Sequence, residues 1–194
     1  MTNAMTRKLK RAWRDEGAAQ IVEFAVSLPL LVLFVVGIFD FSNAITLKQR
    51  LTNAAREAAR VAAADPANDL GGPSAPATVP ASIGDAFQVT DNYLLSEKIN
   101  DCGLAGAGAP TLTGLTWTYT AAGGGCPGTG ITLAINRGCV NQITTPPGTL
   151  NLIGTCVTIT YAYKWQFNSV ASVFGWTGPS LNTLTVTAGA FNEN

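Results

Sequence analysis

The 194-residue sequence contains no histidine and few charged residues. Without histidine the chain lacks the commonest general base and the commonest metal ligand. Charged residues make up only 12% of the chain, against an average near 25%. The six carboxylates between residues 65 and 101 are spread singly rather than gathered into a motif: Asp65, Asp69, Asp85, Asp91, Glu97 and Asp101. We therefore expect a protein that is not an enzyme and that has no cofactor or metal site.

Positive charge is scarce outside the N-terminus. From Pro66 onward the chain has three cations and six acids, which argues against nucleic acid as a partner. Five of the twelve cations lie in the first fourteen residues: Arg7, Lys8, Lys10, Arg11 and Arg14.

An apolar run without charge, from Phe24 to Phe39, follows this basic stretch. A cleaved secretory signal ending at Ser42–Ala44 would have the same order of basic and apolar residues. Against it, the carboxylate of Glu23 lies at the front of the apolar stretch, and the helical pattern continues past the proposed cleavage site. A buried core helix fits the sixteen residues, but not the basic flank. A transmembrane anchor over 18–41 spans about 36 Å at 1.5 Å per residue, enough for a bilayer core.

Charge asymmetry and cysteine position favour the anchor. The positive-inside rule places the basic leader in the cytoplasm and the rest of the chain outside, where all four cysteines can oxidise. We expect a single-pass protein of the inner membrane with these segments: 1–17 basic leader, 18–41 transmembrane helix, 42–65 amphipathic stem helix, 66–81 Gly/Pro-rich linker and 82–194 extracytoplasmic domain.

The stem continues the anchor as one helix, which Asp65-Pro66 ends. An apolar seam steps along it by four and three residues, the spacing of a heptad. This seam either packs on the protein's own sheet or meets another copy of the chain. Its members are Leu47, Leu51, Ala54, Ala58 and Val61.

The exported domain changes from helical to strand periodicity. Ser82-x-x-Asp85 predicts a capping box that opens a helix to about Ile99. The segment "CVTITYAYKWQF" predicts a strand with alternate residues from Val157 to Phe167 on one face. Similar alternation marks three more strands, through Leu115, Trp117 and Tyr119, through Ile131, Leu133 and Ile135, and through Leu184, Val186 and Ala188. The fold class is therefore α+β, with the long helix packed on a mostly antiparallel sheet.

All four cysteines fall in Gly/Thr-rich loops and strands of the C-terminal half, without C-x-x-C spacing. Two disulfides are expected, pinning Gly-rich loops such as "GGGCPGTG" that lack the lysine of a phosphate-binding loop. The pairing Cys102–Cys126 with Cys139–Cys156 is favoured because each bond closes a hairpin-sized loop. The two other pairings stay open.

The N-terminal quarter resembles the TadE-like family, the pseudopilins of tight-adherence pili. The resemblance rests on Gly17 before the run, "VEF", "LPLL", the Gly-x-x-Asp-Phe at the membrane exit and "NAAREAAR". It implies cleavage by a prepilin peptidase and assembly through Glu23, Phe24 and Pro29. It also implies that the glutamate pairs with the new N-terminal amine of a neighbouring subunit.

The spacing departs from the family pattern by one residue. Cleavage after Gly17 makes Glu23 the sixth mature residue, whereas cleavage after Ala18, before Ala19, makes it the fifth. An uncleaved chain stays open too, with Glu23 reaching the lipid head groups beside Arg14.

The resemblance implies a non-catalytic subunit that assembles into, primes or caps a pilus for surface attachment. Its partners would be the membrane, prepilin peptidase, the assembly platform and other pilin or pseudopilin subunits, including second copies of this chain. In a pilus the protein would be extracellular. The alternative is a membrane-tethered extracytoplasmic binding module that never enters a filament.

Overall fold

The computed structural model describes residues 16–70, 78–145, 148–167, 172, 175 and 183–192. The chain divides into two compact units. The N-terminal unit holds residues up to Asn43 together with 165–180, and the sheet unit holds 44–164 and 181–194.

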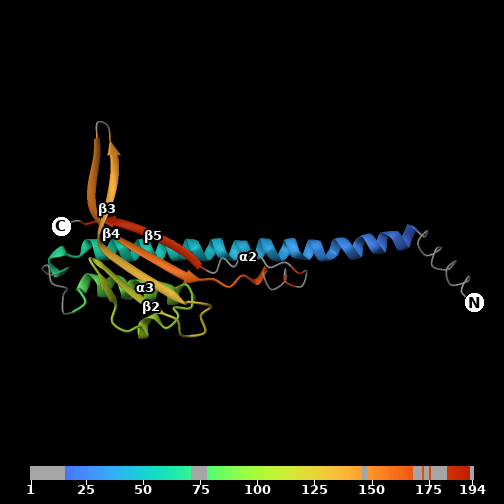
Figure 1. The fold of residues 1–194 in the computed structure, drawn as a ribbon, viewed down its shortest axis with the longest axis horizontal. Coiled ribbons are helices and arrows are strands. Elements are labelled where there is room, and N and C mark those ends of the chain that lie inside the picture. Colours follow the sequence, from blue (N-terminus) through green and yellow to red (C-terminus); the bar gives the residue numbers. More distant parts are fainter. Residues whose placement is uncertain are drawn as a thin grey trace, which may run out of the picture. The chain divides into compact units, whose positions relative to one another are not determined.

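Helix α2, Glu16–Ala64, is continuous through 49 residues, with Pro29 inside it (Figure 1). The expected single long N-terminal helix is therefore confirmed. The helix ends two residues before Pro66, whose ring disfavours helical backbone in the residue that precedes it. Alanine, the best helix former, dominates the last three turns.

Five strands form one sheet in chain order, and every neighbouring pair is antiparallel. The predicted α+β class is confirmed. The strands are β1 Thr111–Thr113, β2 Thr116–Ala121, β3 Ile131–Thr145, β4 Gly148–Ala162 and β5 Thr183–Phe191. Helix α3, Ala81–Ser96, precedes them, and two short 3₁₀ helices lie at Ala67–Leu70 (η1) and Leu104–Gly106 (η2).

The core of the sheet unit joins one face of the sheet to α3 and to the stem half of α2. Alternate strand residues supply the sheet side of this core, as the period of two predicts. The buried residues on β2 to β5 are Trp117, Tyr119, Ile131, Leu133, Ile135, Val157, Ile159, Tyr161, Val186 and Ala188. Helix α3 adds Ile83 and Leu94, both without exposed surface.

Strand β4 ends earlier than its alternation indicates. It stops at Ala162, and Gln166–Phe167 form a helical turn instead of continuing the strand. The neighbouring strands explain the difference, because β3 pairs with β4 only as far as Tyr161 and β5 only as far as Ala162. Among the described residues, neither strand is paired with the chain after Ala162.

Two smaller expectations are also wrong. Helix α3 has Pro80 as its N-cap and no side-chain capping bond, so Ser82 does not form a capping box. Ser82 instead lies in the first turn, wholly buried. Leu115 lies in the turn between β1 and β2 and is 46% exposed, because the β1–β2 hairpin reverses the chain there.

Candidate functional site

The first half of α2 presents apolar side chains to the outside on all of its faces. Between Ala19 and Phe39 no described side chain is fully buried. A helix that is apolar all round belongs in a membrane or among other helices. By length and composition this segment is able to cross a membrane, with a mean hydropathy of 2.6 in its most apolar window. The exposed large residues are Ile21, Val22, Phe24, Val26, Leu28, Leu30, Leu31, Val32, Phe34, Val35, Ile38, Phe39 and Phe41.

Glu23 is the only ionisable residue between 19 and 39. Its side chain is exposed, and no hydrogen bond or ion pair reaches its carboxylate from the part of the chain that the structure describes. The nearby serine is satisfied within the helix, because Ser27 Oγ donates to the Glu23 carbonyl at 2.6 Å. The carboxylate is thus an ionisable group of this surface without an internal partner among the described residues.

The other predicted processing and assembly residues lie along the same helix. Gly17 and Ala18 are in its first turn, and Ala19 is exposed. Phe24 is 66% exposed and Pro29 is half-buried. All of these residues therefore lie on one element, α2.

The predicted seam packs inside the sheet unit. Leu51, Ala54 and Ala58 have no exposed surface, whereas Leu47 and Val61 are half-buried. The buried face is wider than the predicted seam because Ala55, Ala59 and Ala62 are also fully buried. Small side chains on adjacent positions make up this wider buried face, which a heptad count alone does not reveal. Of the two partners considered for the seam, the protein's own sheet occupies it.

Sequence reasoning missed a contact at the end of the apolar run. Asp40 is 3% exposed, and its Oδ2 accepts a hydrogen bond from the backbone N–H of Phe167 at 2.9 Å. One turn earlier, a Cβ added to Gly37 would meet the Phe167 ring at 3.3 Å. The only sequence signal is the Gly-x-x-Asp spacing, which places Gly37 and Asp40 on one helix face.

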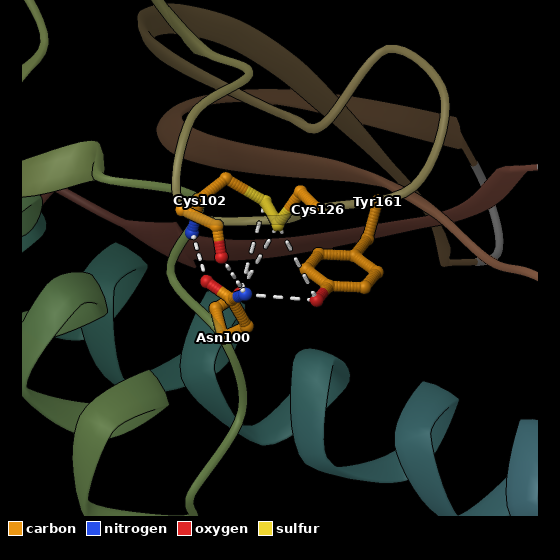
Figure 2. The surroundings of a disulfide bond; sticks show 5 residues. Asn100, Cys102, Cys126 and Tyr161 are labelled. Atoms are coloured by element: carbon orange, nitrogen blue, oxygen red, sulfur yellow. Dashed lines mark hydrogen bonds between the residues drawn. A yellow bond between two sulfur atoms is a disulfide. The ribbon is translucent and has the colours of Figure 1, made fainter.

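The first disulfide, Cys102–Cys126, is organised by Asn100 (Figure 2). Asn100 Oδ1 accepts from the Cys102 amide at 2.9 Å, and its Nδ2 donates to the Gly124 carbonyl at 2.7 Å. Tyr161 Oη donates to the Asn100 carbonyl at 3.0 Å. Burial, and then the charge of Asp101, raise the pKa of Tyr161, so the hydroxyl stays a donor. Asn100, and with it the segment that carries Cys102, is therefore held against Tyr161 of β4.

The second disulfide, Cys139–Cys156, lies at a β-bulge. Both bonds have the pairing favoured from loop size. Arg137 and Gly138 of β3 oppose the single residue Thr155 of β4 at this bulge. Past it, residues 139–145 and 148–153 form a two-stranded arm, which stands away from the rest of the sheet in Figure 1. β2 and β5 pair with β3 and β4 only on the near side of the arm.

Arg137 is fully buried at the bulge, although a lone arginine in a strand would be expected to face solvent. Its Nη1 donates to Thr155 Oγ1 at 3.1 Å and its Nη2 to the Asp65 carbonyl at 2.9 Å. Thr155 Oγ1 in turn donates to Asn192 Oδ1 at 2.7 Å. This network joins the end of α2, the bulge and the chain after β5.

One pair of carboxyl groups lies at the inner side of α3. Asp91 is buried, and its desolvation, followed by the charge of Asp101 and a hydrogen bond to it, raises the pKa of Asp91. Among the described residues, no cluster of three or more acidic or cysteine ligands could hold a metal ion.

Comparison with known proteins finds a match only for part of helix α2. Residues 18–60 match the model of a family described as TadE-like protein. No curated protein and no solved structure matches the chain. The matched range lies wholly within α2, and it confirms the resemblance drawn from the sequence.

Proposed function

We propose, from the premise that α2 carries the helix of a TadE-like protein, that this chain is a non-catalytic pseudopilin-like subunit of a tight-adherence pilus. It would assemble into, prime or cap the filament through the first half of α2. The observation that carries the proposal is the difference in burial between the two halves of α2. Its second half is buried in its own sheet unit, whereas its first half is apolar, exposed and interrupted by one carboxylate.

The apolar side chains of the exposed first half of α2 must be shielded from water. Burying one large apolar side chain is favourable by about 1.5–3 kcal/mol, so a helix with more than ten of them exposed does not remain in water. Lipid shields these side chains in a membrane-anchored subunit, and the helices of neighbouring subunits shield them in a filament. A pilin-like helix would pass from the first environment to the second.

Glu23 would set the register of assembly. A charged residue in a membrane helix costs about 2.5–3.5 kcal/mol at the bilayer centre. An N-terminal amine of a neighbouring subunit would neutralise the carboxylate in a dry helical bundle. The amine becomes available after cleavage at Gly17 or Ala18, and prepilin peptidase and the assembly platform are the partners that this step requires.

The proposed location is the inner membrane, with the leader inside and the sheet unit outside. The basic residues before α2 support this orientation. The two disulfides support it independently, because structural disulfides persist in oxidising compartments. In this arrangement the extracytoplasmic domain, 82–194, carries the surface that the pilus displays.

A tethered binding module outside any filament remains the second candidate. The burial of the seam in the protein's own sheet unit is what this candidate requires. The same burial suits a pilin subunit, whose first half of α2 alone would meet its neighbours. Glu23 therefore separates the two candidates, because a tethered module has no use for a carboxylate there.

The test replaces Glu23 by Gln in cells that make the pilus. The protein is quantified in membranes and in material sheared from the surface. The proposal predicts that Glu23→Gln keeps its membrane level and is lost from the sheared fraction. Glu57→Gln is the matched control, because Glu57 lies on the same helix in an exposed ion pair with Arg60 that contributes little. Absence of the parent and of both variants from the sheared fraction would favour the tethered module, and equal sheared amounts of both variants would remove the assembly role of Glu23.

A further inference from the structure

We propose that the turn Trp165–Phe167 is a second membrane contact, which inserts at the boundary between acyl chains and head groups where α2 leaves the bilayer. This inference rests on the proposed anchoring of α2. The proposed ligand is lipid of the outer leaflet. It would lie in the apolar groove that Phe167 forms with the last turns of the apolar run.

Two contacts hold the turn on the helix. The Phe167 amide donates to Asp40 Oδ2 at 2.9 Å, across 127 residues of sequence. The Phe167 ring covers Gly37, where a Cβ would lie only 3.3 Å from the ring. A glycine at this position thus lets the ring lie against the helix backbone.

The groove beside the ring is apolar. It is lined by Leu33, Phe34, Gly37, Ile38, Phe41 and Phe167. Phe34, Ile38 and Phe41 are more than half exposed, and each belongs to the surface that lipid would cover. The ring therefore extends the lipid-facing surface of α2 rather than covering it from the aqueous side.

The groove lies at the level along α2 where the edge of a bilayer is expected. Gly37 precedes Asp40 by three residues, about 4.5 Å along the helix axis. Asp40 is the first charge after the run from Phe24 to Phe39, so Gly37 lies just inside the apolar segment. Tryptophan is enriched at this level of a membrane, and Trp165 is half-buried two residues before Phe167. Lys164, which is exposed, precedes it as a cation suited to lipid phosphates.

The experiment uses the full chain in phospholipid vesicles that contain a lipid with a diazirine in its acyl chain. After illumination, labelled residues are mapped by mass spectrometry. The proposal predicts labels on α2 between residues 19 and 39 and on Trp165 or Phe167. Val140 and Ile153, which are 59% and 64% exposed on the arm, should carry none and serve as internal controls.

Labels on α2 without labels on the turn would overturn this inference and leave the anchor intact. An unlabelled α2 would instead remove the proposed function, and the inference with it.

A matched pair of variants tests the same contact. Phe167→Glu should lower labelling of Trp165 by about tenfold, because a charge at the apolar boundary of a membrane disfavours insertion by a kcal/mol or more. Labelling of α2 should not change. Phe191→Glu, at a 48% exposed position on β5, should leave both signals unchanged. Unchanged labelling of Trp165 in Phe167→Glu would contradict the proposal.

Discussion

The guanidinium of Arg137 donates to the main-chain carbonyl of Asp65, 2.9 Å away and just past the end of α2. A cation at this place satisfies a carbonyl that has no partner within the helix, and it complements the negative end of the helix dipole. The same side chain bonds to Thr155 at the β-bulge. The stem helix is therefore joined to the base of the arm by one buried residue.

Replacing Arg137 by Met should lower the free energy of unfolding of the sheet unit by about 3 kcal/mol, because buried hydrogen-bonding groups lose a charged partner. Chemical denaturation of the oxidised protein in detergent measures this change. Lys164→Met, at an exposed lysine, is the control and should stay within about 0.5 kcal/mol of the parent. A loss below about 1 kcal/mol in Arg137→Met would show that the network contributes little.

Removing the Cys139–Cys156 bond with paired serines should reduce stability by about 3 kcal/mol, since the bond closes a short loop across 17 residues. The arm beyond the bulge should lose amide protection first, because an isolated two-stranded hairpin is marginally stable. Hydrogen exchange followed by mass spectrometry checks both effects. Cys102→Ser with Cys126→Ser is the comparison, and it should leave protection of the arm unchanged. Equal protection of the arm with and without Cys139–Cys156 would contradict this account.

Ala58→Leu should destabilise the sheet unit by about 1–3 kcal/mol, because extra methylene groups at a fully buried position overpack the core. Ala64→Leu is the control at an exposed position of the same helix. Thermal unfolding followed by circular dichroism compares the two. Similar midpoints for both variants would mean that α2 does not pack on the sheet as closely as described.

Asp91 should make the sheet unit less stable as the pH rises. Because burial raises the pKa of Asp91 in the folded state, its protonated form favours folding. That contribution is complete below the ordinary pKa of about 4 and is lost as the pH rises through the higher folded value. Asp91→Asn should therefore raise stability at pH 7 and change it little below pH 4.

Asp85→Asn, at an exposed position of the same helix, is the control and should change stability little at either pH. Unfolding midpoints measured at both pH values decide the matter. A stabilisation of Asp91→Asn that is equal at both pH values would exclude the titration of Asp91 as its cause.

Local periodicity predicted much of the fold. The period of two located the buried faces of β2 to β5, and the seam through Leu51, Ala54 and Ala58 identified the buried side of the stem. The end of β4 was not predictable in this way, because it depends on where β3 and β5 stop pairing. The alternation from Tyr163 to Phe167 is real in the sequence, but no strand in the described part of the chain pairs with this segment.

The missed residues of the candidate site share one cause. Arg137 meets Asp65 across 72 residues, and Asp40 meets Phe167 across 127. Neither spacing leaves a local pattern, and a single arginine or aspartate suggests a solvated side chain. Glu23 could be identified from the sequence because its context, one carboxylate at the front of an apolar run, is local.

The mass of the mature N-terminus tests the central claim most directly. It should be measured by mass spectrometry on protein from native membranes and on material sheared from the cell surface. The account predicts a chain that begins at Ala18 or Ala19 in the sheared fraction, which would establish prepilin processing and give Glu23 its partner amine. A chain that begins at Met1 and occurs only in membranes, or one that begins at Ile45, would contradict it.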